Sequence, residues 1–213
     1  INDFKVFDDV ISEADFMNNL FETITHWHRV SNSISKAPFM SVDMATFIQE
    51  ITSLHDSVEK IKTNPHKDNI LLDQIDEKIN EIYPYLEELD KLFNGRMQPH
   101  HWNNLFQICG KQNAYYPHIK IEELMKYGIL KEKEKIHDIT TQSQGEAQLE
   151  AEFQSITTHW NNVEIPLIET HDEMTADTMT LGNLNHLFKQ INETQANLQN
   201  MLEMPFVKNI KNS

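Results

Sequence analysis

Between residues 72 and 93, apolar side chains recur at alternating steps of three and four residues, and no other feature limits the fold as strongly. A repeat of this period forms a continuous seam on a helix, which packs along neighbouring helices at a shallow angle. Pro84 lies inside the seam and is expected to kink the helix, because proline removes a backbone hydrogen bond. Asn94-Gly95 is predicted to end it, with the glycine in the left-handed conformation. The seam consists of Leu72, Ile75, Ile79, Ile82, Leu86, Leu89 and Phe93.

Helical periodicity also dominates the rest of the chain. Ser12 with Asp15 resembles a helix start, and Ser41 or Asp43 is expected to cap the next helix. Pro99 suits the first turn of a helix that begins after the glycine. The expected helices cover about residues 12–27, 43–63, 72–93, 99–109, 122–127, 131–160 and 181–204.

Extended structure has little support. Residues 163–168 are the candidate strand, which Pro166 would confine to an edge, and residues 111–121 are expected to form a packed loop. Five glycines and seven prolines are too few for a turn-rich β fold. We therefore predict an all-α fold, an elongated multi-helix bundle or arm with at most one short extended segment. Its expected parts are an N-terminal helical subdomain, 1–130, and a long bridging helix with a following helical subdomain, 131–213.

The centre of the long helix over residues 131–160 is its weakest point. Ser143 and Glu146 interrupt its apolar stripe, and Gly145 costs about 1 kcal/mol relative to alanine in a helix. We expect the helix to bend or to bridge two packing units there, with Gly145 as the hinge.

Charge and composition exclude several classes of partner. A net charge of −15 disfavours nucleic acid and anionic membrane surfaces, since both need clustered Lys and Arg. No apolar run is long enough to span a membrane, and no basic-apolar leader is present. Cys109 is the single cysteine and is interpreted as a small buried hydrophobe. The chain begins with Ile1, and we expect it to be a piece of a longer polypeptide.

No catalytic residue, cofactor-binding residue or metal ligand is predicted, and no cofactor is expected. His26 and His28 would point to different sides of a helix, as would the adjacent pair His100-His101. Glu134-x-x-His137 has the spacing of di-iron bundles, but one copy is insufficient. Adjacent acids such as Glu87-Glu88 are expected to diverge on solvated faces. The tryptophans Trp27, Trp102 and Trp160 continue apolar stripes, so core packing is favoured over binding anchors.

Several segments together resemble the linker region of dynein heavy chains. The joint over residues 92–102 is similar to a family joint with leucine-asparagine, methionine and an arginine-histidine-tryptophan triplet. The order of the other segments also resembles that family over about residues 16–207. These segments are Trp27, Pro38-Phe39, Asp43, the helix with Pro84, Glu146, Leu149, Glu150, Phe153, Ile156, Trp160, residues 181–183 and residues 193–201. His100 stands where arginine is usual and Ser143 where alanine is usual.

The resemblance implies a mechanical role. In that family the linker is a helical arm across a ring of ATPase modules of the same polypeptide, and it bends and straightens to drive minus-end-directed movement on microtubules. Nucleotide sites and the microtubule-binding region lie elsewhere, so the fragment itself would be no enzyme. The implied location is the cytoskeleton, either cytoplasmic or axonemal.

Two other hypotheses stay open from the residues alone. One is a helical interaction scaffold unrelated to motors, such as a spectrin-like or tethering bundle. The other, weaker one is a di-iron bundle enzyme that uses Glu134 and His137.

Overall fold

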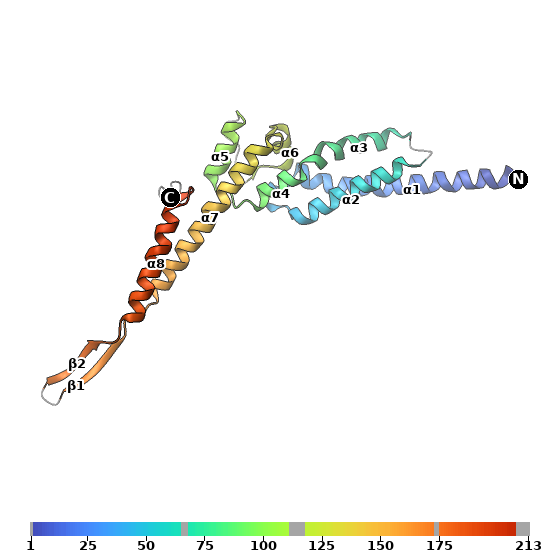
Figure 1. Ribbon diagram of the computed structural model, residues 1–213. Coiled ribbons are helices and arrows are strands. Elements are labelled where there is room, and N and C mark those ends of the chain that lie inside the picture. Colours follow the sequence, from blue (N-terminus) through green and yellow to red (C-terminus); the bar gives the residue numbers. More distant parts are fainter. Residues whose placement is uncertain (1, 65–67, 111–117, 173–174, 208–213) are drawn as a thin grey trace. The chain divides into compact units, whose positions relative to one another are not determined.

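The computed structural model describes residues 2–64, 68–110, 118–172 and 175–207 (Figure 1). Most of these residues are helical, which confirms the all-α prediction. The helices are α1 (Asn2–Ser35), η1 (Phe39–Ser41), α2 (Met44–Lys62), α3 (Ile70–Ile82), η2 (Tyr83–Tyr85), α4 (Leu86–Asn94), α5 (Pro99–Ile108), α6 (Ile121–Lys126), η4 (Ile129–Lys131), α7 (Lys133–Asn161) and α8 (Asn185–Glu203). The strands are β1 (Leu167–Asp172) and β2 (Thr175–Leu181). No helix within the described ranges combines the length and hydropathy of a membrane-spanning segment.

The chain divides into two compact units, Ile1–Thr141 and Gln142–Ser213, and the division falls inside α7. The predicted boundary between residues 130 and 131 stays a prediction. The predicted loop over residues 111–121 lies largely outside the described residues, which resume at residue 118.

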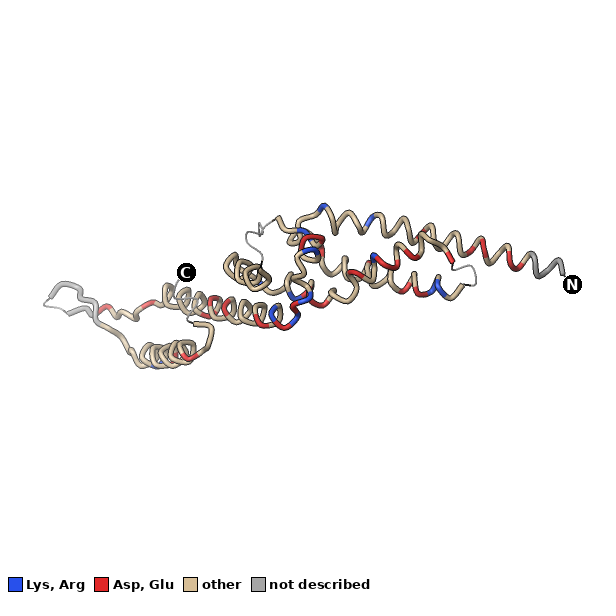
Figure 2. Tube along the Cα trace, turned by 90° about the horizontal axis from the view of Figure 1, so that it is seen from above, with Lys and Arg blue, Asp and Glu red and all other residues tan. Residues whose placement is uncertain are grey.

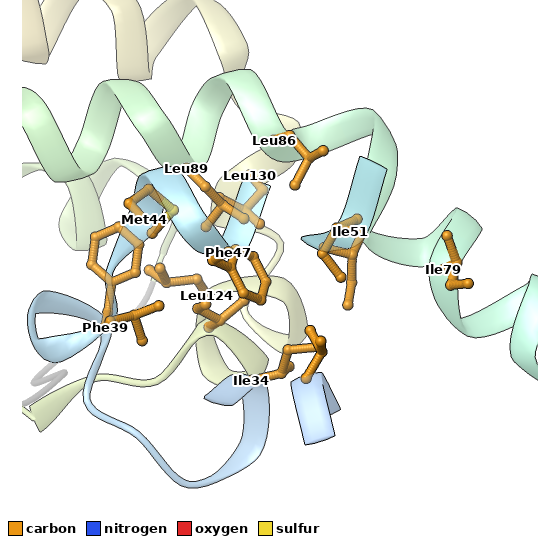
Figure 3. Packing of buried hydrophobic residues seen from close by; sticks show 14 of the residues in the cluster. Ile34, Phe39, Met44, Phe47, Ile51, Ile79, Leu86, Leu89, Leu124 and Leu130 are labelled. Atoms are coloured by element: carbon orange, nitrogen blue, oxygen red, sulfur yellow. The ribbon is translucent and has the colours of Figure 1, made fainter. Parts of the chain in front are cut away.

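Helices α1, α2 and α3 of the first unit pack lengthwise against one another (Figure 1). Their apolar stripes, together with those of α4 and α6, form one hydrophobic core (Figure 3). The largest fully buried side chains belong to Trp102, Phe39, Phe106, Met44, Ile51, Leu54, Leu72, Ile79, Leu89, Leu92, Leu105 and Ile121.

The seam of residues 72–93 is buried as predicted, apart from Phe93, which is partly buried against the core. Pro84 interrupts the helix more strongly than a kink would. α3 ends at Ile82, the single 3₁₀ turn η2 contains the proline, and α4 then begins at Leu86. The apolar spacing continues across the turn, so both helices present the same face to the core.

The predicted left-handed glycine at the end of α4 is wrong. Gly95 has φ −68°, whereas the next residue, Arg96, has φ 50°. Gly95 instead provides room, because a Cβ there would lie 2.8 Å from the carbonyl oxygen of Lys91 and 3.0 Å from Cγ2 of Thr140. Close approach explains this glycine.

The predicted helix start at Ser12 is also wrong, since α1 begins at Asn2. A capping residue begins a helix only where the preceding backbone is non-helical, and residues 2–11 contain no proline or glycine that would interrupt α1 before Ser12. The cap of α2 is confirmed at Asp43, which accepts hydrogen bonds from the backbone N–H of Thr46 (3.3 Å) and from its hydroxyl (2.7 Å).

A β-hairpin is the extended element of the second unit, and it corrects the expectation of at most one extended segment over residues 163–168. β1 and β2 pair antiparallel, with Leu167 opposite Leu181. Pro166 lies just before β1, where its carbonyl accepts a hydrogen bond from the N–H of Gly182 (2.7 Å). The hairpin occupies the chain to residue 181, so α8 begins at Asn185 and not at 181.

Candidate functional site

The joint between α4 and α5 is built around the side chain of Trp102, which is fully buried. Its ring meets the ring of Phe39 edge to face and stacks on Phe106, at centroid distances of 6.0 and 6.1 Å. Phe39 also meets Phe93 of α4 edge to face at 6.0 Å. The backbone N–H of Phe39 donates to the carbonyl of Ile119 at 2.6 Å. Three parts of the chain, around residue 39, residues 93–106 and residue 119, therefore meet at this closely packed joint.

His101 has a local structural role in this joint. Its side chain is buried, and its Nδ1 accepts a hydrogen bond from the backbone N–H of Gln98 at 3.1 Å. Pro99 occupies the first turn of α5, as predicted, and the carbonyl of Gln98 accepts from the N–H groups of His101 and Trp102. These bonds satisfy backbone groups that a helix start leaves without partners.

An ion pair fastens the start of α7 to the seam. The Lys133 ammonium lies 3.1 Å from Oε1 of Glu88 and donates to the carbonyl of Pro84 at 3.2 Å. It also lies 5.8 Å above the ring of Tyr85. Glu88 is only 2% exposed, which corrects the expectation that both acids of Glu87-Glu88 are solvated. Lys133 therefore compensates a carboxylate that is shielded from water.

The centre of α7 is polar but not solvated. Ser143 and Glu146 are buried, and the side-chain amide of Gln142 donates to Oε1 of Glu146 at 2.8 Å. The ring of Phe206 lies close against Gly145. A Cβ at Gly145 would lie 2.5 Å from Cε2 of that ring and closer still to Cδ2, so a larger residue would clash with it. The glycine is a notch in the helix surface that admits an aromatic ring.

Further along, α7 contacts α8. Nε1 of Trp160 donates to the hydroxyl of Thr194 at 3.1 Å. Trp160 and Trp27 are each partly buried, and Trp27 packs against the core of the first unit, so core packing is confirmed for Trp102 and partial for the other two.

The expectation that His100 and His101 would point to different sides of the helix is wrong, because their rings lie 3.8 Å apart between centroids. The other residues that suggested chemistry are dispersed. Glu134 and His137 are exposed on α7 and join no group of three or more possible metal ligands among the described residues. His26 lies 3.9 Å from Oε1 of Glu50, which binds Arg29 more closely, at 2.7 Å. These groups form a surface ion network rather than a reactive site.

Two further side chains are accounted for by packing. His55 stacks on Tyr83 at 4.0 Å between centroids. Cys109 is half-buried, and burial raises the pKa of its thiol, which disfavours the nucleophilic thiolate form.

Contacts between residues far apart in the sequence, such as Lys133–Glu88 and Trp160–Thr194, hold the described helices of each unit together. Sequence reasoning found the joint and Gly145 but missed Lys133–Glu88 and the ring of Phe206. Neither has a local signal, since the partners are 45 and 61 residues apart along the chain.

Comparisons with known proteins agree on one family. Residues 7–213 match the family model described as "Dynein heavy chain, N-terminal region 2". The chain is 19% identical over 213 residues to "Dynein axonemal heavy chain 6" of Homo sapiens, covering 99% of this chain and 5% of that protein. It is 20% identical over 186 residues to "Dynein alpha chain, flagellar outer arm" of Chlamydomonas reinhardtii, covering 87% of this chain and 4% of that protein. The chain thus spans about a twentieth of the relatives it matches.

Proposed function

The chain belongs to the dynein heavy chain family, and from this premise we propose that it is a segment of the linker, the mechanical arm of a dynein motor. In this proposal the segment bends and straightens across an ATPase ring formed by the same polypeptide. Movement is minus-end-directed on microtubules, which other regions of the parent bind. The observation that carries the proposal is the family match over nearly the whole chain.

The described contacts support a mechanical role. An arm must transmit load between its ends, and a helix resists bending best where side chains from distant segments brace it. α7 is braced near its start by Glu88 and near its end by Thr194. The division between the two compact units falls inside this same helix.

Location and partners follow as part of the proposal. Both relatives are named as axonemal or flagellar dyneins, which supports a place in the ciliary cytoskeleton. Family membership argues against the alternative of a scaffold unrelated to motors. Nucleotide hydrolysis is assigned to other regions of the parent, and no catalytic role is proposed for this segment.

A hinge at Gly145 is a finer part of the proposal. Glycine lowers the cost of bending a helix, and this one lies three residues beyond Gln142, where the second unit begins. The notch for Phe206 gives the same glycine a packing role. If the Gly145→Ala variant of the full-length motor keeps the wild-type stroke amplitude and velocity, the hinge has to be assigned elsewhere.

The lever-arm function is tested by breaking α7 in the full-length motor. Gln144 is exposed, so Gln144→Pro disrupts the helix, at about 3 kcal/mol, without removing a core side chain. We expect gliding velocity on microtubules to fall by about tenfold or more, while the ring still hydrolyses ATP. The matched control Gln144→Ala should behave as wild type. Unchanged gliding by Gln144→Pro would refute the lever-arm role.

A further inference from the structure

The outer side of α1 carries a row of apolar side chains that the first unit leaves exposed. Phe7 is 67% exposed and Phe21 69%, and Val10 and Met17 are each more than half exposed. Ala14, also exposed, completes steps of three, four, three and four residues. We call these five residues the outer α1 face.

This spacing is that of a docking seam. The fourteen residue steps from Phe7 to Phe21 span about 21 Å of helix, or about four turns. The core contacts of α1 use another side of the helix, where Phe16, Leu20 and Val30 are buried. α1 therefore has two apolar sides, of which the first unit covers one.

The charge around the outer α1 face has a single sign. Residues 6–28 contain five carboxylates and no Lys or Arg, as Figure 2 shows for the described part of α1. All five are exposed, and none forms an ion pair with another described residue. The carboxylates are those of Asp8, Asp9, Glu13, Asp15 and Glu22.

We propose that the outer α1 face docks an amphipathic helix whose apolar seam is flanked by Lys and Arg. The apolar row supplies buried area to a helix with the same spacing, and the carboxylates select basic flanks. A second copy of this chain would bring acidic flanks against acidic flanks, which is repulsive. An anionic membrane surface is disfavoured for the same reason. The proposal is independent of the lever-arm function, since it concerns a face that the unit does not use.

Binding is tested with designed peptides and the 213-residue chain. The probe is a fluorescent peptide of three heptads with Leu at a and d and Lys at e and g, and its counterpart carries Glu at e and g. We expect fluorescence anisotropy to give a Kd at least about tenfold lower for the Lys peptide, with a difference that shrinks as salt rises.

Variants localise the binding. Phe7→Ser with Phe21→Ser should weaken binding of the Lys peptide about tenfold or more. Glu13→Gln with Glu22→Gln removes the two carboxylates that lie nearest the apolar row on either side, and should weaken binding several-fold and flatten its salt dependence. The matched control is Ile70→Ser, since Ile70 is 72% exposed on another helix and should leave binding unchanged. All substituted residues are exposed, so circular dichroism should report an intact fold.

Three results would overturn the proposal. One is failure of the Lys peptide to bind, or equal binding of the two peptides. Another is unchanged binding by the Phe7→Ser, Phe21→Ser variant. The third is a dimer of the wild-type chain in sedimentation velocity that this double variant abolishes, because the occupant would then be a second copy.

Discussion

Substitution of Gly145 tests whether the contact with Phe206 or helix propensity decides stability in the second unit. Alanine improves α7 by about 1 kcal/mol through propensity. The new Cβ would lie 2.5 Å from Cε2 of Phe206, so the ring has to leave the notch. Removing a fully buried phenylalanine costs about 3–5 kcal/mol, and Phe206 is only partly buried, so losing this contact costs about 2 kcal/mol.

Helix propensity and the contact with Phe206 act in opposite directions, so the effect of Gly145→Ala depends on whether Phe206 is present. We expect Gly145→Ala to destabilise the contact between α7 and the end of α8 by about 1 kcal/mol in the wild-type chain. In a Phe206→Ala background only the propensity term remains, and the same substitution should stabilise α7 by about 1 kcal/mol. The coupling between the two positions is therefore about 2 kcal/mol.

Hydrogen exchange followed by mass spectrometry measures the local stability of α7 and α8. A local measurement is needed because the two units need not unfold together. Peptides from α8 should exchange about fivefold faster in Gly145→Ala than in wild type, since 1.4 kcal/mol corresponds to tenfold. Gln148→Ala, at an exposed neighbouring position, is the control and should leave α8 exchange nearly unchanged. A coupling near zero would refute the notch, because the ring would then not depend on the missing Cβ.

Three further predictions follow from the first unit. Lys133→Met should lower the unfolding free energy of the first unit by about 1–2 kcal/mol in urea, since Glu88 stays buried without its partner. Adding Glu88→Gln should restore most of this loss, and no recovery would contradict the ion-pair reasoning. The hydrogen bonds from Thr46 hold the pKa of Asp43 below its usual value near 3.8. The cap therefore stabilises fully above that value and is lost as pH falls through the lower, folded-state pKa, so Asp43→Asn should reduce the acid dependence of thermal unfolding below about pH 4. Because burial raises the pKa of Cys109, iodoacetamide should alkylate it about tenfold more slowly in the native chain than in urea, and equal rates would show that the thiol is not shielded.

Local pattern determined where most helices of this protein lie, but not the start of α1 at Asn2 or the start of α8 at Asn185. The steps of three and four residues between Leu72 and Phe93 required one buried face whatever the partner, and the Asp43 cap and the Pro99 start needed only neighbours in sequence. The order of the motifs also indicated the dynein heavy chain family, which the family match over residues 7–213 confirms. Periodicity and capping are short-range effects, so one sequence suffices to read them.

Tertiary structure alone decided which faces are covered. Glu88 is buried because Lys133 reaches it from a distant segment, while Phe7 and Phe21 are as apolar as core residues and yet stay exposed. Gly145 appeared to be a weak point until the ring of Phe206 was found on it. These outcomes depend on the approach of residues far apart in the chain. The free energy of such contacts is absent from any local window of sequence, because burial is a property of the assembled neighbours.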